Sequence, residues 1–263
     1  MAEKARYRSV FISDLHLGAY GSKTEKIRTF LDSFETDQLY LVGDIVDGWV
    51  VAGNQAWNDD HTQVLRQLFS QAQLGVEVYF TPGNHDDFGH FMNGVSLGTF
   101  HTDRSFIHTT LDGRRILVVH GDKFDPFTSE HRWLAYGTAL LYEELTLLNK
   151  RMADLWEPII GRRFDFATGF KKFTKRVIKK KTNYEEQLVA HAISLGYDGV
   201  ICGHIHSPAM RSHGEILYVN CGDFVEHGTA VVEHHDGRLE LVAWDGATIA
   251  MTDWNHVPMI VSA

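Results

Sequence analysis

Five short stretches of this chain place acidic, amide or imidazole side chains directly after a run of apolar residues. In residues 39–47, Leu-Tyr-Leu-Val-Gly-Asp-Ile-Val-Asp, the apolar run brings Asp44 to the end of a predicted strand. The other four stretches are residues 10–16, 78–86, 116–122 and 200–206. Together they supply a mixed set of oxygen and nitrogen ligands, about as many as a two-metal hydrolytic site requires.

The spacing of these ligands brings them in pairs to one side of the chain. Asp14 and His16 are two residues apart, as are His204 and His206, so each pair faces one side of an extended segment. Asp44 follows a glycine, and we consider it the candidate for a carboxylate that bridges two ions. An isolated histidine is more often a hydrogen-bonded core or surface residue. The prediction of a metal site therefore depends on the whole set.

Oxygen and imidazole ligands of this kind predict a hydrolytic chemistry. Two divalent cations about 4 Å apart lower the pKa of a bridging water and neutralise phosphate oxygens, so that water can attack phosphorus at neutral pH. Because the set contains no thiolate, it suits Mn, Fe or Zn better than a soft metal. We expect two divalent ions as cofactors, with Mn favoured and Fe, Zn or Mg as alternatives.

The first part of the chain alternates short apolar runs with helical patterns, which is typical of βαβ units and a parallel or mixed sheet. Apolar residues at helical spacing predict one helix over 24–34 and another around 64–72. The predicted strands are residues 7–13, 38–42 and 76–80. Parallel strands end at one edge of a sheet, where ligands bind. Asp14, Asp44 and Asn84 all fall at that edge.

The last part of the chain reads as one helix followed by strands. Residues 185–195 predict a helix that leads into the strand carrying His204 and His206. Turn signals at His213-Gly214 and Asp236-Gly237 separate the strands that follow. These predicted strands, which we expect to form an antiparallel run, are residues 215–220, 229–234 and 239–244.

Length and composition favour an ordinary globular protein. A chain of 263 residues with 44% hydrophobic and 22% charged residues fits one large domain, or one domain with an insertion. Its apolar runs are far shorter than the roughly 20 residues of a membrane-spanning helix, and its start lacks an apolar signal core. We therefore expect a cytoplasmic protein. Cys202 and Cys221 are expected to be buried thiols, with a disulfide as the weaker alternative.

A basic and aromatic segment interrupts the alternating pattern at about residues 124–182, where helical spacing returns. Residues 150–181 contain eleven Lys and Arg against three acidic residues, although the whole chain has a net charge of −9. Such a segment in an acidic chain predicts contact with an anion. The alternative is a solvated helix whose Phe166, Phe170 and Phe173 pack on the domain.

The order of the motifs resembles that of the calcineurin-like metallophosphoesterases. The motifs are Asp14-x-His16, Gly43-Asp44-x-x-Asp47, Gly83-Asn84-His85-Asp86, His120 and Gly203-His204-x-His206. The resemblance implies an α/β fold in which two mixed β-sheets are packed as a sandwich and flanked by helices. Residues 1–263 would then form a single domain, with a helical cap insertion at about 124–182.

The resemblance also implies a role for each motif residue. One ion would be held by Asp14, His16, Asp44 and His206. The other ion would be held by Asp44, Asn84, His120 and His204. His85 would not bind metal but would be catalytic, by stabilising the developing charge or protonating the leaving oxygen. Asp86 would be its catalytic partner and orient it.

Within the family, the position of the insertion is similar to that in the UDP-2,3-diacylglucosamine hydrolases of lipid A biosynthesis. In that group such an insertion receives acyl chains, and the enzyme cleaves the diphosphate to release UMP and an acylated sugar phosphate. The substrate-binding residues expected here are Phe166, Phe170, Phe173, Arg163, Lys171 and Lys172. That group carries an Arg where this chain has His85, so this chain could belong to a sister group with another substrate.

Three functions remain open at this point. The first is hydrolysis of an amphiphilic, lipid-linked nucleotide diphosphate, with peripheral contact to the anionic inner membrane surface. The second is a phosphodiesterase or nuclease, for which the basic insertion would bind nucleotides or nucleic acid; its phenylalanines repeat at helical spacing, which disfavours a base-stacking platform. The third is a non-catalytic metal-binding scaffold, which has no need of buried, mutually repelling carboxylates. The sequence indicates no obligate protein partner.

Overall fold

A computed structural model describes residues 4–19, 21–48, 57–86, 92–125 and 184–252. The chain divides into two compact units, Met1–Gly121 with Glu185–Ala263, and Asp122–Tyr184. In the second unit the structure describes a short 3₁₀ helix, η2 (Asp122–Phe124). Most of the predicted insertion lies outside the described residues, so its role as a helical cap stays a prediction.

The first unit contains an eight-stranded sheet in the order β13-β12-β11-β1-β2-β3-β5-β4. Its strands are β1 (Ala5–Ile12), β2 (Phe34–Val42), β3 (Glu77–Thr81), β4 (Val95–Leu97), β5 (Phe100–Thr102), β11 (Thr229–Glu233), β12 (Leu239–Ala243) and β13 (Thr248–Thr252). Strands β1, β2, β3 and β5 are parallel, and the remaining pairs are antiparallel. The predicted βαβ pattern is thus present in the centre of this sheet.

A five-stranded sheet in the order β6-β7-β8-β10-β9 forms the second layer. Its strands are β6 (Phe106–Thr109), β7 (Arg115–Val118), β8 (Gly199–Cys202), β9 (Ala209–His213) and β10 (Ile216–Asn220). It is also mixed, because β7, β8 and β10 are parallel while the edge strands are antiparallel. The prediction of two mixed sheets is confirmed.

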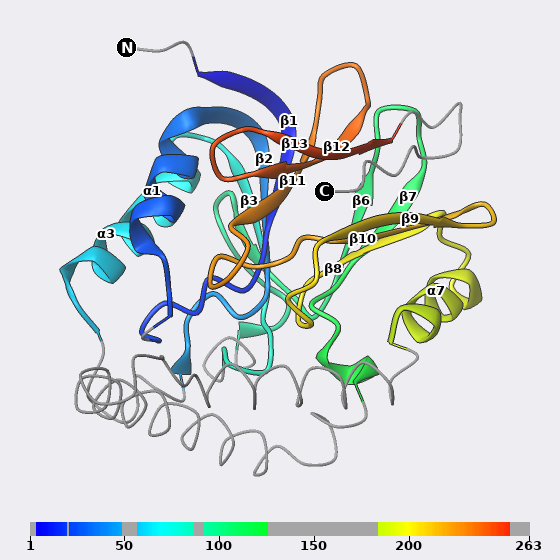
Figure 1. The fold of residues 1–263 in the computed structure, drawn as a ribbon, viewed down its shortest axis with the longest axis horizontal. Helices are drawn as coiled ribbons and strands as arrows, with labels where there is room; N and C mark the ends of the chain where they lie inside the picture. The colour runs from blue at the N-terminus through cyan, green and yellow to red at the C-terminus, as the bar shows by residue number, and fades with distance from the viewer. Residues whose placement is uncertain (1–3, 20, 49–56, 87–91, 126–183, 253–263) are drawn as a thin grey trace, which may run out of the picture. The chain divides into compact units, whose positions relative to one another are not determined.

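Helices flank both layers (Figure 1). They are α1 (Thr24–Ser33), α3 (Asp59–Gln73) and α7 (Tyr184–Ser194). α3 begins at a capping box, in which Asn58 accepts from the His61 amide at 3.1 Å and its own amide donates to His61 Nδ1 at 3.2 Å. α7 lies beside the smaller sheet, where Glu185 contacts Arg211 of β9.

Two apolar clusters explain why the layers pack as they do. One lies between the sheets and includes Phe11 and Tyr40 of the larger sheet with Ile201 and Val219 of the smaller one. The other lies on the opposite face of the larger sheet and contains the buried faces of α1 and α3. Alternate residues of β1 therefore enter different clusters, as the two-residue period of a strand requires.

The prediction of one antiparallel run near the C-terminus is wrong for its first strand. β10 pairs with β8 and β9 in the smaller sheet, whereas β11 pairs with β1 in the larger one. The connection between them crosses from one layer to the other. In this connection the Cys221 amide donates to the Cys202 carbonyl at 2.8 Å, and the Phe224 amide donates to the Asp14 carbonyl at 3.1 Å.

The ligand stretches all follow the carboxyl ends of strands. β1, β2 and β3 end just before Asp14, Asp44 and Asn84, while β7 and β8 end just before His120 and His204. The fold therefore gathers the five predicted stretches at one end of the sandwich.

Within the described ranges, no helix is long and apolar enough to cross a membrane.

Candidate metal centre

Backbone strain is concentrated at the predicted ligands. The described residues include five non-glycine residues with positive φ, and all five belong to the predicted set of seven. They are Asp14 (55°), His16 (45°), Asp44 (53°), His204 (70°) and His206 (48°). Each such residue costs about 1–3 kcal/mol and persists only where the surrounding structure imposes it, commonly at functional sites.

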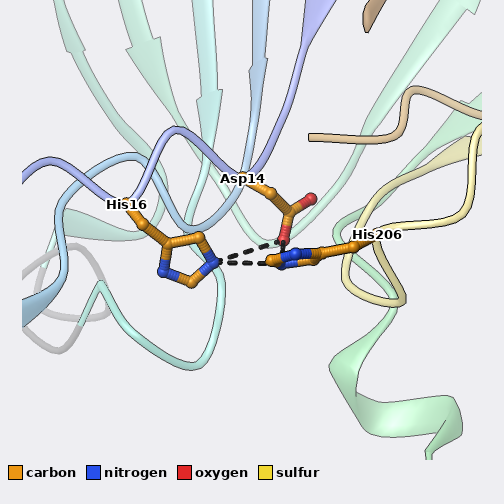
Figure 2. A group of neighbouring side chains, drawn as sticks. All are labelled: Asp14, His16 and His206. Carbon is orange, nitrogen blue, oxygen red and sulfur yellow. Dashed lines mark hydrogen bonds and ion pairs between the residues drawn. The ribbon is translucent and has the colours of Figure 1, made fainter. Parts of the chain in front are cut away.

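The first ligand group consists of Asp14, His16 and His206 (Figure 2). Asp14 Oδ1 lies 3.2 Å from His206 Nε2 and 3.8 Å from His16 Nε2. The two imidazole nitrogens lie 3.1 Å from each other. Three candidate ligand atoms from two distant parts of the chain therefore converge on one point.

The second group consists of Asp44, His120 and His204, whose ligand atoms lie within 4.8 Å of one another. His120 Nδ1 lies 3.0 Å from the Val42 carbonyl oxygen. A ring N–H at this position donates to that carbonyl and turns Nε2 toward the site. His120 Nε2 accordingly lies 3.3 Å from Asp44 Oδ2.

Asp44 joins the two groups through one oxygen. Its Oδ2 lies 3.8 Å from His16 Nε2 of the first group and 3.3 Å from His120 Nε2 of the second. Its other oxygen, Oδ1, accepts a hydrogen bond from the His85 amide at 2.8 Å. The carboxylate is thus oriented with Oδ2 toward both groups.

Asn84 supplies the clearest indication that the site is built for a cation. Its side chain is buried, and its Oδ1 has no hydrogen-bond partner among the described residues. A buried acceptor without a partner costs about 1–3 kcal/mol. A divalent ion accepts amide oxygens, carboxylates and imidazoles as ligands, so the donor set present here fits such an ion.

Two glycines allow the ligand loops to approach so closely. A Cβ atom on Gly83 would lie 2.7 Å from His120 Nε2 and closer still to Asp44 Oδ1. A Cβ atom on Gly203 would lie 2.5 Å from Asp14 Oδ2. That oxygen instead accepts from the His204 amide at 2.9 Å and from the Ser13 hydroxyl. Both glycines are required by the packing of the site.

The site keeps the carboxylates of Asp14 and Asp44 ionised. Burial opposes ionisation of Asp14, but the charge of His206 and the neighbouring imidazole of His16 outweigh it, and the pKa of Asp14 lies well below its ordinary value. Burial acts in the same way on Asp44, where the charges of His120 and His85 hold the pKa well below the ordinary range. Ionised carboxylates are the form that binds a cation.

Asp47 is a residue of the site to which the sequence analysis assigned no role. Its Oδ1 lies 3.1 Å from His85 Nδ1, and its Oδ2 lies 3.3 Å from His16 Nδ1. One buried carboxylate therefore contacts both a predicted ligand and the predicted catalytic imidazole. The signal for it was the second Asp of the Gly43-Asp44-x-x-Asp47 motif, but the spacing alone does not reveal which side chains it meets.

Asp86 lies in a different environment from the one expected for a partner of His85. Its carboxylate is fully buried and accepts hydrogen bonds from backbone amides of two ligand loops. Burial, followed by the negative charge of Asp44, raises the pKa of Asp86 to about 7. The carboxylate placed beside the His85 ring is that of Asp47.

The predicted substrate-binding residues lie outside the described residues. They are Phe166, Phe170, Phe173, Arg163, Lys171 and Lys172. Their contact with substrate stays a prediction from the sequence. The seven predicted ligands and the two predicted catalytic residues, in contrast, all lie within the first unit.

Comparisons with known proteins show which proteins this chain resembles. A family model for calcineurin-like phosphoesterases matches residues 7–208, which include all seven predicted ligands. A UDP-2,3-diacylglucosamine hydrolase from Aromatoleum aromaticum is 28% identical over 250 residues, or 91% of this chain and 94% of that protein. One from Xanthomonas campestris pv. campestris is 26% identical over 255 residues, or 89% and 99%. Among solved structures, YfcE, a phosphoesterase from E. coli, is 16% identical with a TM-score of 0.49, covering 93% of this chain and 97% of its own.

Proposed function

Because the chain belongs to the calcineurin-like phosphoesterase family and is a metal-dependent phosphoester hydrolase, we propose that it is a dinuclear pyrophosphatase. Its substrate would be UDP-2,3-diacylglucosamine or a similar lipid-linked nucleotide diphosphate. The observation that carries the dinuclear proposal is the position of Asp44 Oδ2 between His16 and His120. Relatives with that substrate in their name align with about nine-tenths of the chain, which supports the substrate class.

Each ion would have four protein ligands. Asp14, His16, Asp44 and His206 would hold the first, and Asp44, Asn84, His120 and His204 would hold the second. Divalent ions at these positions, preferably Mn, would supply positive charge to phosphate oxygens and an activated water for attack on phosphorus. Asn84 Oδ1 has no hydrogen-bond partner among the described residues, and the second ion would be its partner.

The residues of this chain would orient the substrate and move protons around that attack. Asp47 lies on the Nδ1 side of His85 and steadies the ring, so Nε2 is the ring nitrogen on the side away from Asp47. From Nε2, His85 would donate a proton to the leaving oxygen or a hydrogen bond to developing negative charge. Asp47 also contacts Nδ1 of His16, which fixes Nε2 of that ligand toward Asp14 and Asp44.

The basic insertion would bind the remainder of the substrate. Its phenylalanines supply apolar area for acyl chains, and Arg163, Lys171 and Lys172 supply positive charge for the diphosphate. We place the protein in the cytoplasm at the inner membrane surface, where an amphiphilic substrate of this kind resides. This part of the proposal is supported by composition alone.

A second candidate is a phosphodiesterase that acts on simpler nucleotides. His85 favours it, since the hydrolase group that the insertion resembles carries an Arg there. The Mn-loaded protein should be assayed against UDP-2,3-diacylglucosamine, bis-p-nitrophenyl phosphate, cyclic nucleotides and single-stranded DNA. We expect the highest kcat/KM on the diacylated substrate, with UMP as a product. A higher value on a cyclic nucleotide or on DNA would replace the lipid proposal with the second candidate.

A further inference from the structure

The side chain of Asp86 connects two ligand loops. Its Oδ1 accepts a hydrogen bond from the Val46 amide at 2.8 Å. Its Oδ2 accepts from the Ile45 amide at 3.2 Å and from the Gly83 amide at 3.0 Å. We call this arrangement of one carboxylate and three amides the Asp86 clasp. The amides of Ile45 and Val46 directly follow Asp44, and the amide of Gly83 directly precedes Asn84.

The same two loops are joined in the opposite direction. The amide of His85, from the second loop, donates to Asp44 Oδ1 of the first loop at 2.8 Å. A further bond has the same direction as the clasp, since the Gly48 amide of the first loop donates to the His85 carbonyl of the second at 3.0 Å. Each loop therefore supplies a carboxylate that accepts a hydrogen bond from a backbone amide of the other loop. With Oδ1 of Asp44 held in this way, Oδ2 is the oxygen that faces both ligand groups.

We propose that Asp86 is a positioning residue that sets Asp44 and Asn84 for metal binding, rather than the acid–base partner of His85. The inference rests on the proposed metal-binding role of those two residues. Two observations carry it together. The Asp86 carboxylate is fully buried against backbone amides, and the position beside His85 Nδ1 is occupied by Asp47.

A carboxylate suits this position for a physical reason. When ionised, it offers two acceptor oxygens and no donor, so it can face three N–H groups at once, and its charge then strengthens each hydrogen bond. An Asn side chain of the same shape would turn an NH₂ group toward at least one backbone N–H. Asp44 has a positive φ of 53°, and the amides that follow it would then have less to hold that conformation.

The test is the substitution Asp86→Asn, with Mn²⁺ binding titrated in the absence of substrate. We expect Mn²⁺ affinity to fall by about 10- to 100-fold, as is typical when a residue that orients metal ligands is lost. We expect activity on bis-p-nitrophenyl phosphate to recover at saturating Mn²⁺, with an unchanged pH profile. Wild-type Mn²⁺ affinity together with a lowered kcat and a shifted pH profile would overturn the proposal and make Asp86 the partner of His85.

Glu233→Gln is a matched control, because Glu233 is also a fully buried carboxylate that accepts a backbone amide, from Leu111 at 3.0 Å. It should keep wild-type Mn²⁺ affinity. An equal loss of affinity in both variants would mean that Asp86→Asn acts through global stability, which contradicts the proposal.

A measurement on the wild-type protein tests the proposal even if the Asp86→Asn variant does not fold. Hydrogen exchange in metal-free protein should be slow at the amides of Val46 and Gly83, because the clasp exists before the ions bind. Rapid exchange at both amides would show that no clasp is formed. Neither the Mn²⁺ titration nor the exchange measurement uses the diphosphate substrate, so a failure of the proposed substrate assignment leaves this test intact.

Discussion

Two buried polar regions of the first unit differ in how completely the protein satisfies them. The metal centre contains strained backbone, two imidazole nitrogens facing each other at 3.1 Å, and Asn84 Oδ1 without a partner among the described residues. The second region surrounds Glu233. Its Oε2 contacts Arg8, the Ser9 hydroxyl at 3.0 Å and His108 at 2.9 Å.

The Glu233 network also satisfies its remaining atoms. Oε1 accepts from the Leu111 amide at 3.0 Å, and His108 Nδ1 lies 3.1 Å from the Tyr40 hydroxyl. Because Glu233 is on β11 and His108 is on β6, the network ties the larger sheet to the smaller one. Buried polar groups that are fully paired specify packing, whereas convergent groups that remain incompletely paired indicate a ligand. The two regions should therefore respond in opposite ways to substitution.

The largest effect is expected at Asp44. Asp44→Asn removes the shared negative charge of both proposed sites, which should cost several kcal/mol of transition-state stabilisation, or roughly 10³-fold in kcat/KM. Elemental analysis should show fewer than two ions per chain. A large loss of metal-free stability would erase the contrast with the Glu233 network.

At His85 we expect loss of chemistry without loss of metal. His85→Ala should lower kcat by about 10²-fold, the usual scale for losing an acid or an oxyanion donor. Steady-state kinetics at saturating Mn²⁺ measure this effect, and metal analysis provides the control. If metal content falls in parallel, His85 supports the ligands instead of the reaction.

Glu233→Gln should behave in the reverse manner. It weakens the hydrogen bonds that the carboxylate makes with Arg8 and His108, so we expect the free energy of unfolding to fall by about 1.5–3 kcal/mol. Chemical denaturation of the metal-free protein measures this change. Mn²⁺ affinity and kcat should stay at wild-type values, and a clear loss of either one would mean that the two regions are coupled.

The pH dependence of that variant sharpens the comparison. Burial opposes ionisation of Glu233, but the hydrogen bond and charge of His108, aided by Arg8, lower the pKa of Glu233 below its ordinary value. Its ionised form therefore stabilises the fold above the unfolded pKa of about 4.3, and this contribution is lost as the pH falls through the folded-state pKa. The Gln variant should show a flatter loss of stability in acid.

The smallest effect is expected in the predicted insertion. Replacing Phe166, Phe170 and Phe173 with serine should raise KM for a diacylated substrate about tenfold or more, because apolar area for the acyl chains is lost. KM for bis-p-nitrophenyl phosphate, which needs only the metal centre, should hardly change. Equal increases on both substrates would show that the stripe is core packing and would remove the lipid proposal.

The ligand set could be predicted from the sequence because strands impose simple geometry. Parallel strands end at one edge of a sheet, so the residues that follow them lie close together. Alternation along an extended segment does not explain why Asp14 meets His16, because both residues have positive φ. The structure brings together Asp14, His16 and His206 in one group and Asp44, His120 and His204 in the other. The positive φ angles that aim them could not be predicted, because a non-glycine residue adopts that conformation only when distant loops impose it.

The contacts of Asp47 and Asp86 were beyond sequence reasoning for a related reason. Both are acidic residues in ligand motifs, and nothing in their spacing distinguishes a carboxylate that meets an imidazole from one that meets backbone amides. The sequence also could not predict that β10 and β11 belong to different sheets. Turn signals locate the end of a strand but not the layer in which the next strand pairs.

The bridging role of Asp44 is the central claim, and anomalous diffraction from crystals of the Mn-loaded protein tests it most directly. We predict two anomalous peaks, one among Asp14, His16 and His206 and the other among Asn84, His120 and His204, with Asp44 Oδ2 bound to both ions. A single peak in the fully loaded protein, or two peaks that do not share Asp44, would contradict the account.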